Sequence, residues 1–329
     1  MIYKNFGNSD EKLSQMGLGC FSMSGAYGIG NDEESLATIQ LALDLGITLL
    51  DTSASYGQGH NHRLIGKALK NGRRDKVFIH SKSGTIKTDQ GSKAEGSGTP
   101  ARLRELCETS LQNLGTDYLD AFCMSRIDPS VPVEESVGGM GRLVEEGKTR
   151  FIGLSEASPE SLKRGYTEHP LVSLQYEYSL WTRDVENGHL AACEELGMAM
   201  MAYAPLGYGF LTGTITDESG LEQEDTRQKF PRFKPDNMKK NLEKVAVIQE
   251  VAKTYDATPA QIAIAWTFLG GEPVFPIPGC KTRVHLEENV GAIDIALNKE
   301  DIDKLNQVFA PESVSGDRYP PDGMARVNL

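Results

Sequence analysis

The sequence lacks the features of a membrane protein and of a nucleic-acid-binding protein. None of its apolar runs approaches the roughly 20 residues that a bilayer-spanning helix needs, and its start, MIYKNFGNSDEKL, is too polar for a signal peptide. Positive charge is scarce, because 34 Lys and Arg face 46 Asp and Glu, which gives a net charge of −12. Such an acidic chain disfavours non-specific binding to nucleic acids and anionic membranes, but it is compatible with a local basic pocket for an anionic cofactor.

Cysteine is sparse and shows no metal or redox spacing. The chain has five cysteines, an odd number, and no Cys-x-x-Cys motif; they are Cys20, Cys107, Cys123, Cys193 and Cys280. We therefore expect reduced thiols, mostly in the core, and a cytoplasmic protein. His60 and His62 lack a third ligand with helix or strand spacing, so we expect no metal site and interpret this pair as a surface feature at a helix start.

What the sequence does contain is a regular alternation of short apolar runs and amphipathic stretches. Eight apolar runs resemble buried strands, namely 13–20, 47–53, 76–82, 118–124, 149–155, 171–179, 198–205 and 273–279. Helix-like stretches lie between them at 32–46, 100–115, 133–147, 158–169, 188–197 and 241–270, and several end in glycine. Repeated strand–helix units predict a parallel sheet whose strands are buried on both faces.

Eight such units over this length fit a (β/α)8 TIM barrel, and we expect a single barrel domain over residues 1–329. The alternative is an open, doubly wound sheet. Two long polar segments, 85–100 and 212–237, each follow an apolar run. In a barrel they would be loops at the C-terminal face, where long loops commonly cover a ligand. Simple disorder of these segments is the alternative.

Ionisable residues lie at or just after the ends of two successive predicted strands. Asp51 lies near the end of ITLLDTS, Lys82 ends KVFIHSK, and Tyr56 lies on the loop after Asp51. A barrel carries its chemistry at that end, so the three side chains would converge. A nearby ammonium group stabilises phenolate and lowers a tyrosine pKa, so the tyrosine could protonate a carbonyl oxygen. A purely structural salt bridge between Asp51 and Lys82 is the alternative.

The order and spacing of several motifs resemble the aldo-keto reductase family over nearly the whole chain. These motifs are DTSASYG, FIHSK, RIDP, EEGKTRFIGLSE, LQYEYSL, AYAPLGYGFLTG and PIPGCKTRVHLEEN. The resemblance implies a (β/α)8 barrel that binds NADPH extended across its C-terminal mouth, without a Rossmann domain. It also implies that Tyr56 is a proton donor and that Lys82 and Asp51 tune it.

The sequence departs from the family pattern at the usual fourth catalytic residue. The family usually has histidine where LDAFCMSRIDP places Ser125, whereas Arg126 and Asp128 are kept. A serine hydroxyl can donate one hydrogen bond to a carbonyl oxygen, but it is shorter than imidazole and cannot take up charge around neutral pH. Some members with pyridoxal reductase activity also lack this histidine, so a pyridoxal-like aldehyde is a candidate substrate.

His80 is a second departure, because the family usually has a small residue at this position of FIHSK. Side chains alternate along a strand, so His80 shares the inward face with Lys82 and lies one layer deeper, about 6–7 Å down. We hypothesise that His80 occupies polar space vacated near Ser125. A neutral core histidine that serves only packing is the alternative.

The nicotinamide end of the cofactor is assigned by resemblance. Hydride transfer needs the nicotinamide face held against the substrate carbon. The resemblance implies that Ser155 and Gln175 hydrogen-bond the carboxamide and that Tyr203 stacks on the ring. Glu156 stands where many relatives have asparagine.

A glycine-rich segment, PLGYGFLTG, follows the seventh apolar run. Pro205 and Leu206 begin it, and its glycines Gly207 and Gly209 let backbone amides approach a pyrophosphate. A Rossmann fingerprint would open a βαβ unit and carry an acidic residue about 20 positions later. This segment comes too late in the chain for that interpretation.

The adenosine end is predicted after the eighth run, where GCKTRVHLEEN carries Lys281, Thr282 and Arg283. Two cations and a hydroxyl at a helix N-terminus suit a phosphate monoester, which favours NADPH over NADH. Glu288 and Asn289 resemble the family's adenine contacts. A solvated charge pair is the alternative for Lys281 and Arg283.

The predicted substrate pocket is mostly apolar or aromatic, which suits a carbonyl compound with an aromatic or aliphatic body. With the two long loops, its residues are Phe21, Met23, Tyr27, His80 and Met124. The leading prediction is an NADPH-dependent aldehyde or ketone reductase. An NADPH-binding sensor or accessory subunit is the alternative, but a pure binder has no chemical need for a tyrosine with a paired lysine and aspartate.

Overall fold

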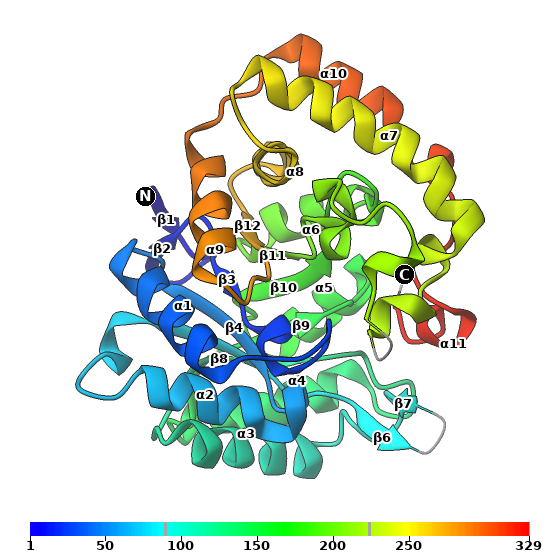
Figure 1. The fold of residues 1–329 in the computed structure, drawn as a ribbon. Coiled ribbons are helices and arrows are strands. Elements are labelled where there is room, and N and C mark those ends of the chain that lie inside the picture. Colours follow the sequence, from blue (N-terminus) through cyan, green and yellow to red (C-terminus); the bar gives the residue numbers. More distant parts are fainter. Residues whose placement is uncertain (89–90, 223–224, 329) are drawn as a thin grey trace.

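Eight parallel strands close into a barrel, as the sequence predicts (Figure 1). The computed structural model describes residues 1–88, 91–222 and 225–328. The barrel strands are β3 (Leu18–Gly19), β4 (Leu49–Ser53), β5 (Phe78–Lys82), β8 (Leu119–Met124), β9 (Thr149–Ser155), β10 (Ser173–Glu177), β11 (Ala199–Tyr203) and β12 (Val274–Ile277). They pair in this order, and backbone hydrogen bonds from Gly17 N to Pro276 O at 2.9 Å and from Gly19 N to Pro278 O at 3.1 Å join the first strand to the last. The open-sheet alternative is therefore excluded.

Successive side chains on each strand point alternately into the barrel and outward to the helices, so the protein has an inner core and an outer core. Leu50 and Ile79 point outward and belong to the larger cluster between strands and helices, whereas Leu49 and Phe78 belong to the inner cluster. A hairpin of β1 (Tyr3–Asn5) and β2 (Lys12–Ser14) precedes the barrel. Between these two strands, the Phe6 ring packs 4.9 Å from the Phe78 ring. Apolar side chains thus fill the N-terminal end, and the polar inward positions lie toward the C-terminal end.

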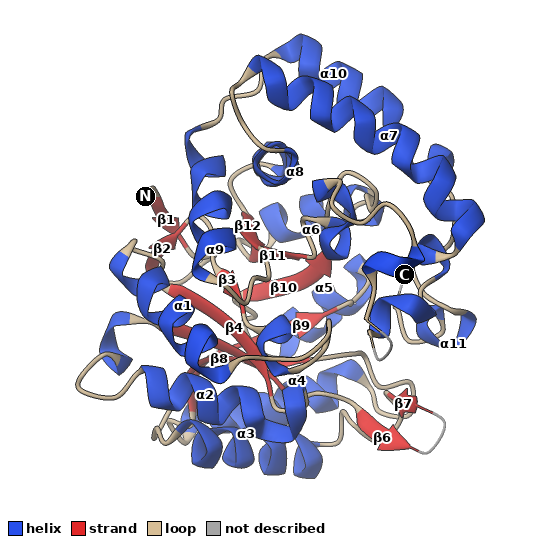
Figure 2. Cartoon of the chain, viewed as in Figure 1, coloured by secondary structure: helices blue, strands red, loops and turns tan. Residues whose placement is uncertain are grey.

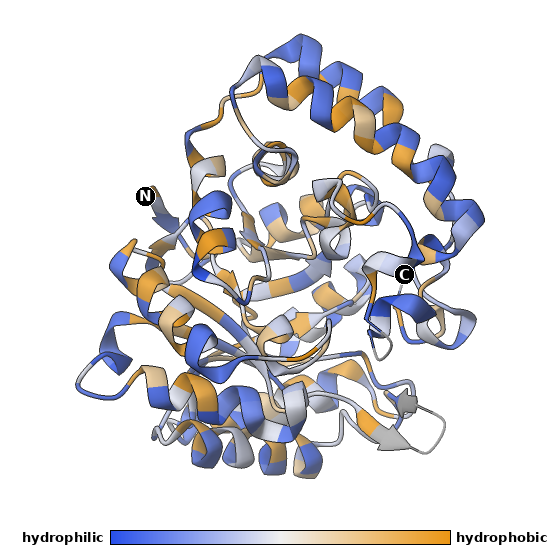
Figure 3. Cartoon of the chain, in the orientation of Figure 1, coloured by the Kyte–Doolittle hydropathy of each residue, from blue (hydrophilic) through white to orange (hydrophobic). Residues whose placement is uncertain are grey.

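Helices surround the strands (Figure 2). They are α1 (Asp32–Asp44), α2 (His60–Ala68), α3 (Pro100–Leu114), α4 (Val133–Glu145), α5 (Pro159–Glu168), α6 (His189–Glu195), α7 (Pro235–Thr254), α8 (Pro259–Thr267), α9 (Arg283–Val290), α10 (Lys299–Val308) and α11 (Pro321–Met324). Met238, Val245 and Ile248 are buried on one face of α7, and Figure 3 shows orange and blue alternating along this helix. Within the described ranges, no helix combines the length and apolar character that a membrane crossing requires.

The helix-like stretch 241–270 is two helices in the structure. Helix α7 ends at Thr254, and Asp256 has a positive φ of 49°. The Thr258 side chain accepts a hydrogen bond from Gln261 N, the Gln261 side chain accepts one from Thr258 N, and Pro259 is the first residue of α8. Proline disfavours helical backbone at the preceding residue, and this capping box stabilises a new helix start.

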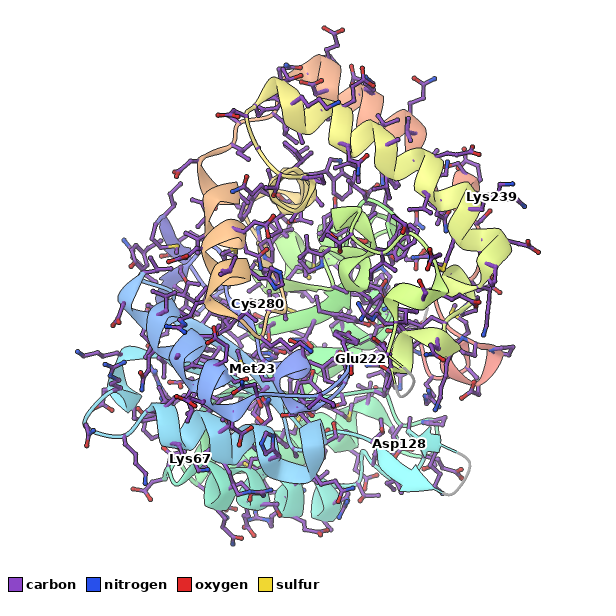
Figure 4. The ribbon with its side chains drawn as sticks, viewed as in Figure 1. Met23, Lys67, Asp128, Glu222, Lys239 and Cys280 are labelled. Atoms are coloured by element: carbon purple, nitrogen blue, oxygen red, sulfur yellow. The ribbon has the colours of Figure 1, made fainter. Side chains whose placement is uncertain are left out.

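Both long polar segments follow barrel strands, as predicted, although residues 89–90 and 223–224 within them lie outside the described part. The first contains a hairpin of β6 (Ile86–Thr88) and β7 (Gly91–Lys93). The second reaches the loop after β3, where Thr226 Oγ1 donates to Ala26 O at 2.9 Å and Ile29 N donates to Glu222 Oε2 at 3.2 Å. Figure 4 labels Glu222 near the centre of the view and the exposed Lys239 on the outer side of α7.

Candidate active site

Asp51 and Lys82 form a buried ion pair inside the barrel mouth. Strands β4 and β5 pair with Ser53 opposite Lys82, and the lysine Nζ lies 2.6 Å from Asp51 Oδ1 and 2.7 Å from Oδ2. Nζ also donates to Thr52 O at 2.9 Å, and the two charged residues are only 3% and 5% exposed. Burial alone would raise the pKa of Asp51, but the Lys82 ammonium and the His80 hydrogen bond outweigh it and lower the pKa.

Tyr56 begins the 3-10 turn after β4, and its ring lies beside the ion pair. Lys82 Nζ is 5.1 Å from the centre of this ring, and the Phe21 ring packs on it at 4.6 Å. Burial raises the pKa of Tyr56 well above its usual value, and the Asp51 charge raises it further, while Arg126 opposes this shift. The predicted lowering of the Tyr56 pKa is therefore wrong for this arrangement, because burial disfavours the charged phenolate and the Asp51 carboxylate adds to that effect.

His80 lies deep in the barrel, on the inward face that the sequence predicts. Its Nδ1 is 3.3 Å from Asp51 Oδ1, and its Nε2 is 3.0 Å from Ser173 Oγ. The ring is fully buried, and burial lowers the pKa of His80 despite the neighbouring Asp51. Both ring nitrogens thus have partners other than Ser125, and one of these partners is the Asp51 carboxylate.

Ser125 follows β8 and is fixed by the neighbouring loop. Its Oγ accepts from Gly84 N at 2.6 Å, and its backbone N donates to Ser83 Oγ at 3.1 Å. Arg126 Nη1 donates to the Ser125 carbonyl at 2.6 Å. Because the Gly84 amide uses an Oγ lone pair, the hydroxyl hydrogen is left for another acceptor.

The predicted carboxamide ligands Ser155, at the end of β9, and Gln175, in the middle of β10, lie opposite each other in the sheet. Both are buried, and Gln175 Nε2 donates to Asp51 Oδ1 at 2.6 Å. Asp51 Oδ1 therefore receives hydrogen bonds from Lys82, His80 and Gln175. The predicted nicotinamide site is therefore connected through Gln175 to the Asp51–Lys82 ion pair.

A second buried charge cluster, which the sequence did not reveal as a unit, lies beside this site. Glu156, at a positive φ of 57°, and Glu177, at the end of β10, are fully buried. Arg318 from the C-terminal segment pairs with Glu156 at 2.5 Å and with Glu177 at 2.8 Å. The Tyr203 hydroxyl donates to Glu156 Oε1 at 2.9 Å, and Tyr208 donates to Glu177 Oε2 at 2.6 Å. Glu177 shares an inward face with Gln175 and could have been found from that spacing, whereas nothing in the sequence marks Arg318.

The loop after β11 has the backbone that a closely approaching ligand requires. Gly207, Tyr208 and Gly209 have successive positive φ values of 55°, 58° and 89°. A Cβ on Gly207 would lie 2.6 Å from Trp181 Cε2, so only glycine fits there. Pro205 and Leu206 precede these residues, and only Ala204 separates them from the end of β11 at Tyr203.

Lys281, Thr282 and Arg283 meet at the start of α9, as predicted. Thr282 is the N-cap, and its side chain accepts from His285 N. Arg283 is held by Glu34, with its Nη2 2.9 Å from Glu34 Oε2, and Lys281 Nζ donates to Tyr27 O at 2.9 Å. Arg283 therefore stands in a charge pair here, and a phosphate would have to compete with the Glu34 carboxylate.

Farther along α9, the predicted adenine contacts differ in exposure. Asn289 is buried, whereas Glu288 is partly exposed and its backbone carbonyl accepts from Gln261 Nε2 at 3.0 Å. Both lie within two turns of Thr282, on the same short helix.

Aromatic rings form one side of the predicted substrate pocket. The Phe21 ring lies 5.5 Å from the Tyr27 ring, which in turn lies 6.3 Å from the Tyr208 ring. Met23 and Met124 are instead fully or almost fully buried in the outer core. Met124 points outward because it follows the inward position of Cys123 on β8.

The predictions for the histidine pair and for the five cysteines can also be compared with the structure. His62 is fully buried, with its Nε2 2.9 Å from Ser81 Oγ, so the interpretation of the histidine pair as a surface feature is wrong for this residue. Only its neighbour His60 is partly exposed at the helix start, where it contacts Asp32 at 3.0 Å. The five cysteines are all free and buried.

The mouth residues fit a nicotinamide dinucleotide. Glu156 Oε2 is buried and has no hydrogen-bond partner among the described residues, so it can accept from an amide such as the carboxamide of nicotinamide. The Tyr203 ring is only partly buried and its hydroxyl is anchored, which leaves a fixed aromatic surface. The Gly207 loop and the start of α9 supply two further places for phosphate groups.

Comparisons with known proteins agree with this geometry. The profile of the Aldo/keto reductase family matches residues 15–310. The chain is 39% identical to a probable aldo-keto reductase of Glycine max over 315 residues, which cover 95% of this chain and 90% of that protein.

Solved structures resemble the chain over almost its full length. A glycerol dehydrogenase from Gluconobacter oxydans has a TM-score of 0.83 and 26% identity, with 97% of this chain and 98% of that chain covered. A thermostable aldo-keto reductase in complex with the inhibitor epalrestat has a TM-score of 0.74 and 29% identity, with 94% and 100% covered. The chain belongs to the aldo/keto reductase family of oxidoreductases.

Proposed function

We propose that this oxidoreductase reduces aldehydes or ketones to alcohols with NADPH and that Tyr56 is the proton donor. One observation carries the proposal, which is the buried Asp51–Lys82 ion pair with Lys82 Nζ 5.1 Å from the Tyr56 ring. A tyrosine, a lysine and an aspartate at the carboxyl ends of barrel strands form a proton-transfer group at the place where barrels carry their chemistry.

The proton step follows from the charges around Tyr56. Burial and Asp51 keep the phenol protonated, so its hydroxyl is ready to donate to a carbonyl oxygen. Once the proton has left, the Lys82 ammonium stabilises the phenolate, and Asp51 holds that ammonium in place. Ser125 donates its free hydroxyl hydrogen to the same carbonyl oxygen, in place of the usual histidine.

Four residues around the mouth would hold the nicotinamide end of the cofactor, namely Ser155, Glu156, Gln175 and Tyr203. When bound, NADPH supplies a hydride to the carbonyl carbon, which with the tyrosine proton completes an alcohol. The loop residues Pro205, Leu206, Gly207 and Gly209 would face the pyrophosphate. Lys281, Thr282 and Arg283 would bind the 2′-phosphate, and Glu288 and Asn289 the adenine, which is the basis for preferring NADPH to NADH.

The substrate side favours a flat, aromatic aldehyde. The Phe21 ring lies 4.6 Å from the Tyr56 ring, and the Tyr27 ring lies 5.5 Å from the Phe21 ring. Such surfaces stack on an aromatic ring. A pyridoxal-like aldehyde is therefore the first candidate, and free thiols in all five cysteines agree with a cytoplasmic setting.

The test is NADPH oxidation with a panel of aldehydes that includes pyridoxal, carried out with the wild type and Tyr56→Phe. We expect turnover of at least one aromatic aldehyde, and a loss of kcat of about a hundredfold or more in Tyr56→Phe with NADPH binding retained. A Tyr56→Phe variant that keeps the wild-type kcat would eliminate the tyrosine mechanism. NADPH binding without turnover of any compound would instead identify a sensor or accessory subunit.

A further inference from the structure

The C-terminal segment brings two side chains into the barrel mouth. Residues 311–328 run beside the segment leading into α7 and contain α11, drawn in red near the C-terminus in Figure 1. Ser315 N donates to Asn241 Oδ1 at 2.9 Å, and at the far end Asn328 Oδ1 accepts from Ser158 N at 2.8 Å. Between these anchors, Arg318 is only 4% exposed. A surface tail would not bury an arginine, so this segment is part of the folded mouth.

Arg318 bridges the ends of three neighbouring strands. Its Nη2 lies 2.5 Å from Glu156 Oε1 and 2.6 Å from the Tyr203 hydroxyl, and its Nε lies 2.8 Å from Glu177 Oε2. Glu156 follows β9, Glu177 ends β10 and Tyr203 ends β11. Two buried carboxylates would repel each other, and the planar guanidinium fork both neutralises them and fixes their directions.

The same cluster restrains two parts of the proposed cofactor site. Tyr319 Oη lies 2.7 Å from Tyr203 Oη and 3.2 Å from Tyr208 Oη. Tyr203 carries the ring proposed to stack on nicotinamide, and Tyr208 lies in the loop proposed to face the pyrophosphate. Fixing their hydroxyls fixes the tilt of both rings, because a tyrosine has only two side-chain torsions.

A purely structural role for the ion pairs of Arg318 would explain why Arg318 is buried. It would not explain why one oxygen of Glu156 has no hydrogen-bond partner among the described residues. Glu156 Oε2 is buried and unpartnered within the described residues, although Oε1 of the same carboxylate accepts from Arg318 and Tyr203. Its residue also has a left-handed backbone, with a φ of 57°, which costs free energy for a residue other than glycine. Strain and an open acceptor together indicate that this carboxylate is held in place for a ligand.

We propose that Arg318 is a positioning residue for the nicotinamide half of the cofactor, acting through Glu156, Glu177 and Tyr203. This inference rests on the proposed function, since it requires that the mouth binds NADPH. It makes the C-terminal segment a component of the cofactor site rather than a passive tail.

The test compares Arg318→Lys with the matched control Asn328→Ala in the full-length chain. Lysine keeps the positive charge but cannot reach three acceptors with a planar fork. Asn328→Ala removes the side-chain contacts of the same segment with Ser158 and Ser161, and it leaves the backbone hydrogen bond from Asn328 N to Glu156 O, both carboxylates and Tyr203 in place. We expect Arg318→Lys to raise the Kd for NADPH, measured by fluorescence titration, about tenfold or more, while kcat at saturating NADPH stays within about threefold of the wild type. The control should keep its Kd within about twofold.

A second measurement uses only the wild type and does not depend on how well a variant folds. Hydrogen exchange with and without NADPH should show increased protection of the amides of residues 315–319, because binding and segment order are reciprocally linked. Unchanged exchange there, together with protection of Gly207–Thr212, would overturn the inference, as would an unchanged Kd in folded Arg318→Lys. Both of these results leave the proposed function intact, whereas a wild type that fails to bind NADPH at all contradicts the proposed function itself.

Discussion

Replacing Lys82 with methionine is expected to cost a large share of the stability of the protein. The two Lys82–Asp51 contacts of 2.6 and 2.7 Å correspond to an attraction of about 6 kcal/mol at an effective dielectric constant of ~20. Desolvation offsets part of it, but removal of one partner strands a buried charge and typically costs about 3–5 kcal/mol. Since domains are commonly stable by about 5–15 kcal/mol, Lys82→Met should lower the free energy of unfolding severely.

The double variant Asp51→Asn/Lys82→Met is the control for this reasoning. It removes both charges and keeps an oxygen that can accept from His80 and Gln175. Urea unfolding, followed by the fluorescence of Trp181 and Trp266, should show that the double variant regains most of the lost stability. It should remain catalytically poor, with a kcat lower by about 10²–10⁴-fold. A Lys82→Met variant that loses less than about 1 kcal/mol, or a double variant as unstable as the single one, would refute the buried-pair account.

The pH dependence gives an independent check. The folded-state pKa of Asp51 is lowered, chiefly by Lys82 against the effect of burial, so its stabilisation is present above its unfolded pKa of about 3.9 and is lost as the pH falls below it. Without Lys82, burial should raise the Asp51 pKa, and protonation then relieves the unpaired charge. The stability difference between wild type and Lys82→Met should therefore be largest around neutral pH and shrink on acidification. A difference that stays constant with pH would contradict this assignment.

Three further predictions concern other contacts. His80→Ala removes the buried hydrogen bonds to Asp51 and Ser173 and should lower the unfolding free energy by about 1–3 kcal/mol with only a few-fold change in kcat; a loss of kcat of a hundredfold with stability intact would assign His80 a direct part in catalysis. Glu34→Gln removes the carboxylate that pairs with Arg283. It should lower the Kd for NADPH about threefold or more and leave the Kd for NADH unchanged. A substitution that changes both Kd values by the same factor would argue against a phosphate site at Arg283. Thr258→Ala removes the N-cap of α8 and should cost about 1 kcal/mol in urea unfolding, and unchanged stability would show that the cap is dispensable.

The strand pattern and the positions of the residues proposed as catalytic could be predicted from the sequence. Apolar runs of strand length, each followed by an amphipathic stretch, leave a closed parallel barrel as an efficient way to bury all strands on both faces. Alternation then fixes the direction of each side chain, which is why His80 and Lys82 were correctly expected on one inward face. The same rule, applied to β8, would have excluded Met124 from the pocket.

The sequence by itself thus indicated eight strand–helix units and placed Asp51 and Lys82 at strand ends with Tyr56 on the following loop, because these features follow from local periodicity and strand direction. The choice between a barrel and an open sheet depended on the pairing of the first strand with the last. Only the tertiary structure decided how charges are shared between distant segments. In the folded protein, Arg318 forms ion pairs with Glu156 and Glu177, and Arg283 forms one with Glu34. Burial also raises the pKa of Tyr56, where the sequence predicted a lowering. Partners separated by more than a hundred positions leave no periodic trace in the chain, and the balance between burial and pairing depends on distances that exist only after folding.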